Sequence, residues 1–197
     1  VELRWTTTDF ISLTSPSATA SGFGDNWFGP QVRLYRQTPH VPSIAVGYAA
    51  KFHSASAAKG LGSGRTDHQL QLLVSKDLFS IHFDFNASTF WIGRPGGVGY
   101  DRNAQFNLAF GHALYRTLQV QGEFYGNTRL NASTAGYASG LAALVWMVTP
   151  RLELDAGLDT GMSHSAPRRR VFVGFTYSIA NLYQAARGHG AAAARKN

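Results

Sequence analysis

Charged and hydrogen-bonding side chains recur at every second position of several segments, and these residues could carry the chemistry of the chain. In residues 79–93, His82, Asp84 and Asn86 alternate with phenylalanine and isoleucine. Side chains of a strand point alternately to its two faces, so this segment has one polar and one apolar face. The same alternation gives a wider polar set: Glu2, Arg4, Arg33, Lys51, His53, His82, Asp84, Asn86, Glu123, Glu153, Asp155 and Asp159.

Metal, nucleotide and catalytic chemistry gain little support from these spacings. A metal site would need a third convergent ligand beside His82 and Asp84, and the chain has no cysteine to supply a thiolate. The glycine-rich residues 59–68 lack the ending of a phosphate-binding loop. Two serine–histidine pairs come without a nucleophile elbow or an orienting acid: Ser80/His82 and Ser163/His164. We therefore predict no catalytic residue, no metal and no cofactor.

The elements that position the polar set are predicted to be about ten long strands. Alternation extends over 44–52, 106–110, 118–124, 152–162 and 171–179, as well as over 79–93. The predicted strands have roughly 10 to 14 residues, whereas soluble strands peak near 5 to 6 and about 9 to 11 cross a bilayer. Their length therefore favours a membrane-crossing sheet over a soluble β-sandwich, which is the alternative.

The connections between the predicted strands alternate between short and long. The short ones are 36–42, 75–78, 114–117 and 148–152, and the long ones are 14–22, 53–65, 93–103, 126–136 and 163–170. Outer-membrane barrels have short periplasmic turns and long extracellular loops. We predict an all-β, antiparallel, up-and-down transmembrane β-barrel over residues 1–180, followed by a basic, alanine-rich periplasmic tail over 181–197.

Each face of the predicted barrel would meet a different environment. In lipid, a sheet must close on itself so that all backbone groups are paired. The apolar set would face lipid, and it comprises Phe79, Ile81, Phe83, Phe85, Trp91, Val171, Val173, Phe175 and Tyr177. The polar set would line the lumen, either as a solute pathway or as an ion-pair network that holds a narrow barrel closed. These two interpretations are compatible, and the sequence leaves both open.

Composition agrees with a membrane barrel. Only 15% of the 197 residues are charged, against roughly 25% in soluble domains, and no run of about 18 apolar residues predicts a membrane helix. The net charge of +7 indicates an acidic partner. Nucleic acid is disfavoured because the basic residues fall in turns. Lipopolysaccharide phosphates are the predicted partners of residues near the long connections: Lys59, Arg65, Arg94, Arg102, Arg129 and Arg168 to Arg170.

Residues 22–35, 42–68 and 152–177 resemble a known family. The resemblance rests on Gly22, Gly24, Asp25, Gly60, Gly62, Gly64, Asp67, Asn86, Asp155, Gly157, Asp159, Gly161, Pro167 and Gly174. The sequence is similar to the outer-membrane barrels assigned to a "MetA-pathway of phenol degradation", regarded as transporters. The resemblance covers nearly the whole chain and implies about twelve strands, so a further hairpin is expected ahead of Val1.

We therefore predict a non-enzymatic barrel of the Gram-negative outer membrane. Its predicted function is to pass small molecules, aromatic or hydrophobic ones among them. The alternative is a structural or partner-binding barrel with a blocked lumen, which would anchor a larger complex.

Overall fold

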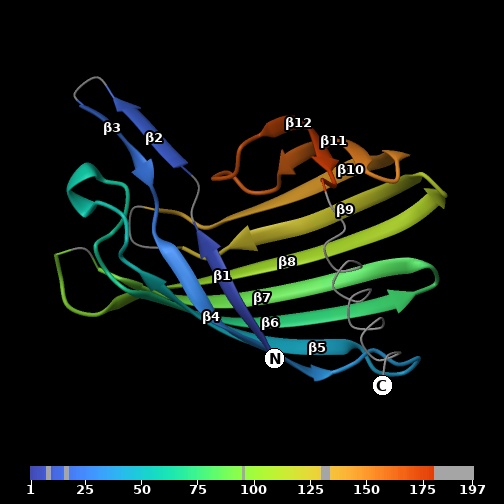
Figure 1. Ribbon diagram of the computed structural model, residues 1–197, viewed down its shortest axis with the longest axis horizontal. Coiled ribbons are helices and arrows are strands. Elements are labelled where there is room, and N and C mark those ends of the chain that lie inside the picture. The colour runs from blue at the N-terminus through green and yellow to red at the C-terminus, as the bar shows by residue number, and fades with distance from the viewer. Residues whose placement is uncertain (8–9, 16–17, 95, 130–133, 180–197) are drawn as a thin grey trace, which may run out of the picture.

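The computed structural model describes residues 1–7, 10–15, 18–94, 96–129 and 134–179, and these residues form an antiparallel β-structure (Figure 1). The predicted tail over 181–197 lies outside the described residues. The strands are β1 (Glu2–Thr7), β2 (Phe10–Ser15), β3 (Ala18–Phe23), β4 (Asn26–Tyr35), β5 (Ser43–Phe52), β6 (Asp67–Leu78), β7 (Ile81–Gly93), β8 (Tyr100–Tyr115), β9 (Leu118–Asn127), β10 (Tyr137–Thr149), β11 (Leu152–Gly161) and β12 (Arg169–Tyr177). One 3-10 helix, η1 (Ala57–Lys59), lies between β5 and β6.

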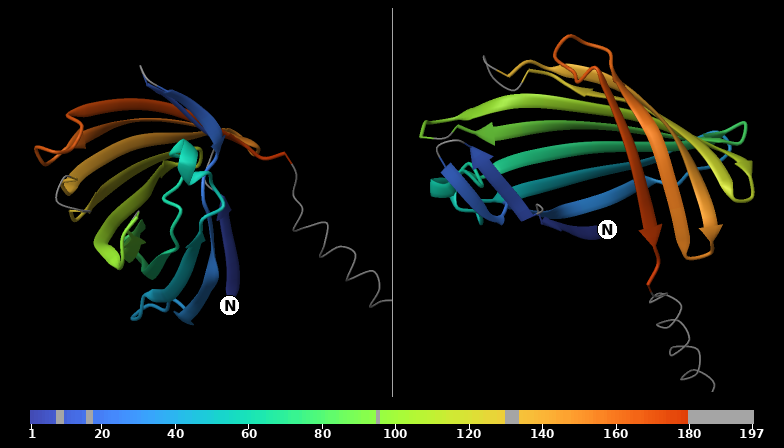
Figure 2. Two further views of the ribbon diagram at one scale, coloured as in Figure 1. Left: turned by 90° about the vertical axis from the view of Figure 1, so that its left-hand side faces the viewer. Right: turned by 90° about the horizontal axis from the view of Figure 1, so that it is seen from above.

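Ten of the strands form one sheet in the order β1-β4-β5-β6-β7-β8-β9-β10-β11-β12. Every neighbouring pair is antiparallel, and from β4 onward each strand pairs with the next one along the chain. This confirms the predicted all-β, up-and-down architecture with about ten strands. Figure 2 shows that the sheet curls strongly about its long axis, with β1 and β12 at its two edges.

A separate hairpin replaces the long connection that the sequence predicted over 14–22. Strands β2 and β3 form their own two-stranded sheet and project from the link between β1 and β4 (Figure 1). Phe10 and Phe23 pack edge to face across it, with ring centroids 5.6 Å apart. The prediction missed the hairpin because serine, threonine and alanine give a weak alternation.

Three of the four short connections are tighter than predicted, whereas 36–42 has the predicted bounds. The turn between β6 and β7 consists of Phe79 and Ser80 alone, so the predicted turn at 75–78 is wrong and Phe79 is not a strand residue. Both residues have positive φ, 50° for Phe79 and 65° for Ser80, as a two-residue type I′ hairpin requires. The prediction failed because that turn normally carries asparagine or glycine. The other tight turns are 116–117 and 150–151.

Short and long connections lie at opposite ends of the sheet. The long ones comprise 53–66, 94 with 96–99, 128–129 with 134–136, and 162–168 among the described residues, and they share their end with the β2–β3 hairpin. The 36–42 connection and the two-residue turns lie at the other end, together with Val1 and the end of β12. We call these the long-loop end and the short-turn end.

Among the described residues, no helix is both long enough and apolar enough to cross a membrane.

Candidate functional site: the concave polar face

One row of paired residues crosses eight strands and fixes which side chains share a face. The row runs through Ser43, Ser75, Asp84, Ala109, Glu123, Leu141, Asp159 and Arg170 on β5 to β12. Direct partners in an antiparallel sheet point to the same side, and so do residues two apart in a strand. Asp84, Glu123 and Asp159 therefore share one face of the sheet.

The same register places the other predicted polar residues. Glu2 pairs with Gln31, Arg33 with Ala45, and Lys51 with Asp67, all on the face of the Asp84 row. Arg4, His82, Asn86, Glu153 and Asp155 follow by the period of two within their strands. His53 is the exception, because β5 ends at Phe52 and His53 lies exposed beyond it.

Side-chain amides dominate the same face, and of these only Asn86 was singled out from the sequence. They are Gln31, Gln69, Gln71, Asn86, Asn103, Gln105, Asn107, Gln119, Gln121 and Asn127. Gln69 donates to Ser88 at 3.2 Å, and Asn107 donates to Glu123. The pairs Gln69/Gln71 and Gln119/Gln121 carry the period of two in the sequence, which was the available signal.

Hollows along this face join into one furrow. One is lined by His82, Asp84, Gln121 and Glu123, and the next by Gln71, Asn86, Asn107 and Glu123. A third is lined by Arg4, Trp27, Gln31, Gln71 and Phe90. Glu123 and Gln71 are each shared between two of them, so the furrow is continuous from β9 to β1. We call the face that carries it the concave face.

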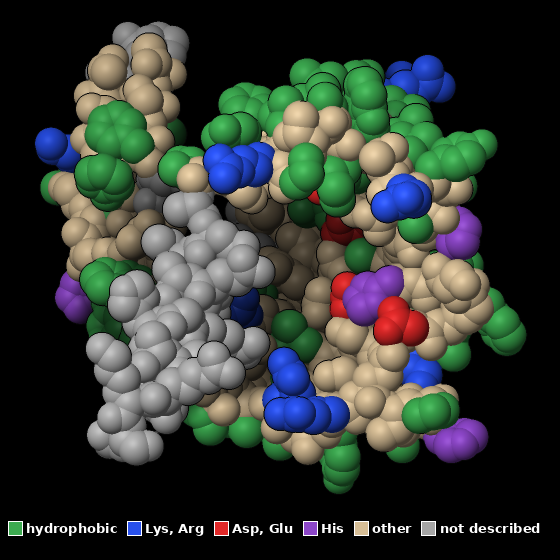
Figure 3. Space-filling model, turned by 45° about the vertical axis from the view of Figure 1, so that its right-hand side comes forward, with side chains coloured by type: hydrophobic (Ala, Val, Ile, Leu, Met, Phe, Trp, Pro, Cys, Tyr) green, Lys and Arg blue, Asp and Glu red, His purple; other side chains and the backbone are tan. Residues whose placement is uncertain are grey.

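Figure 3 brings the short-turn end forward and shows this hollow from outside. Acidic and histidine side chains border it, and lysine or arginine side chains lie across from them. At this end His82 lies between two carboxylates, with Nδ1 2.6 Å from Asp77 and Nε2 3.0 Å from Asp84. Gln37 donates to Asp77 at 2.6 Å. In the described part of the chain, no group of three or more His, Cys, Asp or Glu residues could hold a metal ion.

A second polar cluster ties β9, β11 and β12 together. Tyr125 donates its hydroxyl to Asp159 at 2.7 Å, and Arg170 Nε donates to the same carboxylate oxygen at 2.8 Å. Arg170 also donates to the Tyr125 hydroxyl at 2.6 Å. Since Asp159 is only 4% exposed, this cluster fixes one side of the concave face.

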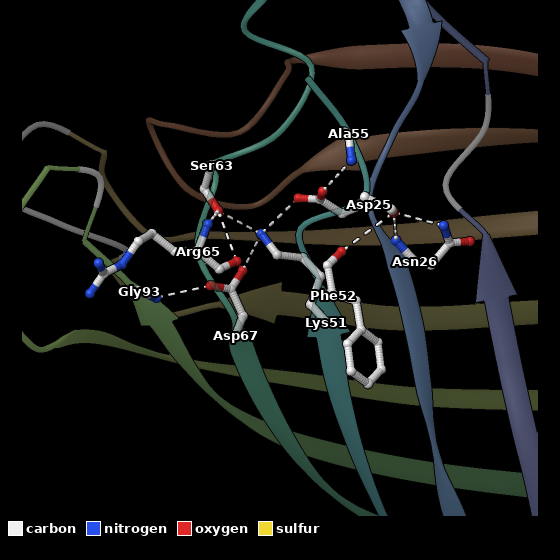
Figure 4. A network of polar contacts seen from close by, with 10 residues as sticks. Asp25, Asn26, Lys51, Phe52, Ala55, Ser63, Arg65, Asp67 and Gly93 are labelled. Carbon is white, nitrogen blue, oxygen red and sulfur yellow. Dashed lines mark hydrogen bonds and ion pairs between the residues drawn. The ribbon is translucent and has the colours of Figure 1, made fainter. Parts of the chain in front are cut away.

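The long-loop end is held by a buried lysine. Lys51 Nζ lies 3.1 Å from Asp25 and 2.6 Å from Asp67, and it donates to Ser63 at 2.8 Å (Figure 4). Asp25 accepts the Ala55 backbone N–H at 3.0 Å, so the network ties the 53–66 connection to the residue before β4 and to β5 and β6. All three charged side chains are about nine-tenths buried or more.

Two further contacts explain why small residues surround this network. Asp67 accepts the Gly93 N–H at 2.9 Å. A Cβ added at Gly62 would lie 2.7 Å from an Asp25 carboxylate oxygen, so only glycine leaves room for the carboxylate there. Three residues of the family resemblance, Asp25, Gly62 and Asp67, thus meet at this buried cluster.

The opposite face is apolar between its two ends, and near those ends its described strands carry Lys76, Arg102 and Arg169. The predicted Ile81, Phe83, Phe85 and Trp91 lie on it, and so do Val171, Val173, Phe175 and Tyr177 of β12, which pair with Leu158, Ala156, Leu154 and Leu152. Phe79, in the turn between β6 and β7, is 96% exposed. Within the described strands, every aspartate and glutamate lies on the concave side and none on this convex face.

The dimensions of the convex face match a bilayer. From Ile81 to Trp91 a strand rises about 33 Å at roughly 3.3 Å per residue. A tilt of about 40° reduces that rise to about 25 Å, the height of the apolar band on outer-membrane barrels. Aromatic residues lie at both ends of the band, with Trp5 and Trp91 near the long-loop end and Tyr115 and Trp146 near the short-turn end.

Comparison with known proteins assigns the chain to a family. The model of the family described as "Putative MetA-pathway of phenol degradation" matches residues 4–179. The chain belongs to this family. Among solved structures, a NanC porin is similar to this chain with a TM-score of 0.51 and 11% sequence identity, over 86% of this chain and 91% of that chain. No curated protein sequence matches. Family and fold together support an outer-membrane channel in general terms.

Proposed function

We propose that this protein is a passive conduit of the Gram-negative outer membrane for small molecules. The observation that carries the proposal is the separation of chemistry between the two faces. The described strands turn their carboxylates and amides toward a continuous furrow, while the convex face is apolar over the thickness of a bilayer. A soluble β-sandwich would bury its apolar face, whereas Val171, Val173 and Phe175 are 79%, 81% and 74% exposed.

The composition of the furrow supports a class of solute. Neutral amides offer both donors and acceptors to hydroxyl groups without imposing a charge. Trp27 and Phe90 pack edge to face in the furrow, with ring centroids 6.0 Å apart, and add an apolar aromatic surface beside the amides. A small neutral solute that combines an aromatic ring with hydroxyl groups would use both features. The phenol-degradation description of the family is consistent with such a solute.

The alternative is a structural or partner-binding barrel whose lumen is blocked. The buried Asp25–Lys51–Asp67 network and the Asp159–Arg170 pair favour it, because such ion pairs cross-link strands and occupy interior space. The two functions differ in a measurable property, which is whether ions and solutes pass.

Reconstitution of the full chain into planar bilayers and liposomes tests the proposal. We expect ion conductance, together with faster liposome swelling in a dihydroxybenzene than in a benzoate of similar size. Gln71→Trp places a large ring in the furrow and should reduce both signals. Leu72→Trp, one residue along and on the convex face, is the matched control and should leave them unchanged. Absence of current and of flux from well-folded protein would establish the blocked barrel instead.

A further inference from the structure

At the long-loop ends of β5 to β8, the carboxylates lie on the concave face and an arginine lies on the convex face. The carboxylates point inward and have cationic partners there, since Asp67 binds Lys51 and Asp101 accepts from Arg94 Nε at 2.8 Å. On the convex face of the same region, Arg102 is exposed. Within the described residues, no carboxylate lies within ion-pair distance of Arg102. An anion approaching from outside the sheet would therefore meet a cation without a competing acid.

Arg102 belongs to a row of interfacial residues on that face. His68 pairs with Trp91, and Trp91 pairs with Arg102, so the three side chains lie side by side on β6, β7 and β8. Tryptophan on an outer-membrane barrel marks the level of the headgroups. Arg102 thus lies at headgroup depth, where a guanidinium can bind phosphate through two hydrogen bonds.

His68 is held in place by two tyrosines from neighbouring strands. The Tyr48 hydroxyl lies 2.6 Å from His68 Nδ1, and the Tyr100 hydroxyl lies 3.4 Å from Nε2. The Tyr48 and His68 rings are stacked with centroids 6.1 Å apart. Both tyrosines are partly exposed, so the cluster presents two phenol hydroxyls and an imidazole beside Arg102.

A second arginine reaches the same region from the 53–66 connection. Gly93 follows Trp91 on the convex side, and a Cβ added there would lie 2.7 Å from Arg65 Cβ and 3.5 Å from its Cγ. The stem of Arg65 therefore lies against Gly93, two residues beyond Trp91 in β7, and the Arg65 side chain is exposed (Figure 4). We call Arg65, His68, Trp91, Arg102, Tyr48 and Tyr100 the convex basic patch.

We propose that the convex basic patch binds the phosphorylated headgroup of lipopolysaccharide in the outer leaflet. The proposal rests on the proposed membrane placement, with the long loops outward. Charge complementarity supports it: two arginines meet phosphate, while the aromatic residues lie against the boundary between sugar and acyl chain. Of the arginines near the long connections, Arg94 and Arg170 are already bound to aspartates, so the patch uses Arg65 and Arg102.

Native mass spectrometry of the folded full chain in detergent, titrated with lipid A, tests this site. We expect Arg65→Gln/Arg102→Gln to bind lipid A about tenfold more weakly than wild type, since charge-assisted hydrogen bonds to phosphate are lost. Lipid A stripped of its phosphates should bind wild type as weakly as intact lipid A binds this variant. Arg36→Gln/Arg151→Gln removes the same number of charges at the short-turn end and should bind like wild type.

Equal binding of lipid A by wild type and by the Arg65/Arg102 variant would overturn the proposal. Competition by millimolar inorganic phosphate would also overturn it, because the site would then recognise free phosphate and not a lipid. Folding of each variant is checked by its heat-dependent mobility in gels. The assay does not measure transport, so a barrel with a blocked lumen would still show lipid A binding. Failure of the proposed lipid A site can therefore be distinguished from failure of the proposed conduit function.

Discussion

At the scale of the residue, Lys51 is the side chain whose loss should cost most. It neutralises Asp25 and Asp67 in a site that is nearly closed to water. Removing one member of a buried ion-pair group leaves the remaining charges unpaired in a medium of low dielectric constant, and such changes cost about 3–5 kcal/mol.

We predict that Lys51→Met destabilises the folded barrel by about 3 kcal/mol, because two carboxylates lose their common counter-charge. The free energy of unfolding in urea, measured in lipid vesicles, reports the change. Lys59→Met, in the exposed turn of η1, is the matched control and should change stability by less than about 0.5 kcal/mol. Similar values for the two variants would show that Lys51 is hydrated.

The sequence predicted the face of most individual residues but few of their contacts. Alternation predicted that Lys51 and Asp84 share a face, and the strand register places both on the concave face, because a period of two is a property of the strand itself. It could not show that Lys51 meets Asp25, since those residues come together only through the register of β4 with β5 and the return of the 53–66 connection. Apart from Asn86, the amide lining was not singled out from the sequence, because its side chains carry no charge.

At the scale of the element, the turn between β6 and β7 carries backbone strain. Phe79 and Ser80 both adopt left-handed conformations, which cost roughly 1 kcal/mol or more for residues other than glycine and asparagine. The neighbouring strands hold this turn, since β6 and β7 pair in register up to Leu78 and Ile81.

We predict that Phe79→Asn/Ser80→Gly stabilises the barrel by about 1 kcal/mol, because Asn-Gly suits a type I′ turn. Equilibrium unfolding in lipid measures the gain. Arg116→Asn/Thr117→Gly makes the same replacement in the turn between β8 and β9, where both φ values are negative, and should destabilise the barrel. A loss of stability in the first variant would indicate that the exposed Phe79 ring binds the membrane interface.

The strand β7 provides a test of the two faces. Phe85 lies midway between Ile81 and Trp91 on the convex side, at the centre of the proposed apolar band. We predict that Phe85→Arg costs about 2–4 kcal/mol in lipid, whereas Asp84→Asn, one residue away on the concave side, costs less than about 1 kcal/mol. Unfolding measurements that gave the reverse order would show that lipid contacts the other face.

At the scale of the whole molecule, net charge and lumen charge have opposite signs. The chain carries a formal charge of +7, yet the described strands turn their acids toward the furrow. Within the described residues, no cation lies within ion-pair distance of Glu123 or Asp155. Net charge alone would therefore give the wrong sign for the field inside the furrow.

We predict a preference for cations over anions, measured as the reversal potential across a bilayer with a salt gradient. Glu123→Gln/Asp155→Asn should lower the cation-to-anion permeability ratio by a factor of about two, because two acids of the concave face lose their charge. Arg102→Gln, on the convex face, should leave the ratio unchanged. Anion preference in wild type would place the controlling charges at Arg4 and Arg33.

The overall strand architecture was more predictable from the sequence than the β2–β3 hairpin and the exact bounds of the turns. Strand count, antiparallel order and the alternation of connection lengths all follow from local patterns, which persist along the chain. The β2–β3 hairpin and the extent of the tight turns depend on pairing energies that weakly alternating serine and threonine segments do not reveal.

The long connections lie at one end of the sheet and the short turns at the other, so the two ends of the molecule differ. In the proposed orientation, the 94–99 connection, with Val98 at 94% exposure, would protrude from the cell, whereas Val1 and Tyr177 would sit on the inner side. From residue 36 onward, antibodies, phages and proteases in the medium would then contact four described connections. These lie between β5 and β6, between β7 and β8, between β11 and β12, and, at 128–129 and 134–136, between β9 and β10. The other described connections from 36 onward would face the inner side. Selection by such contacts should therefore raise sequence variability in those segments and not in the two-residue turns.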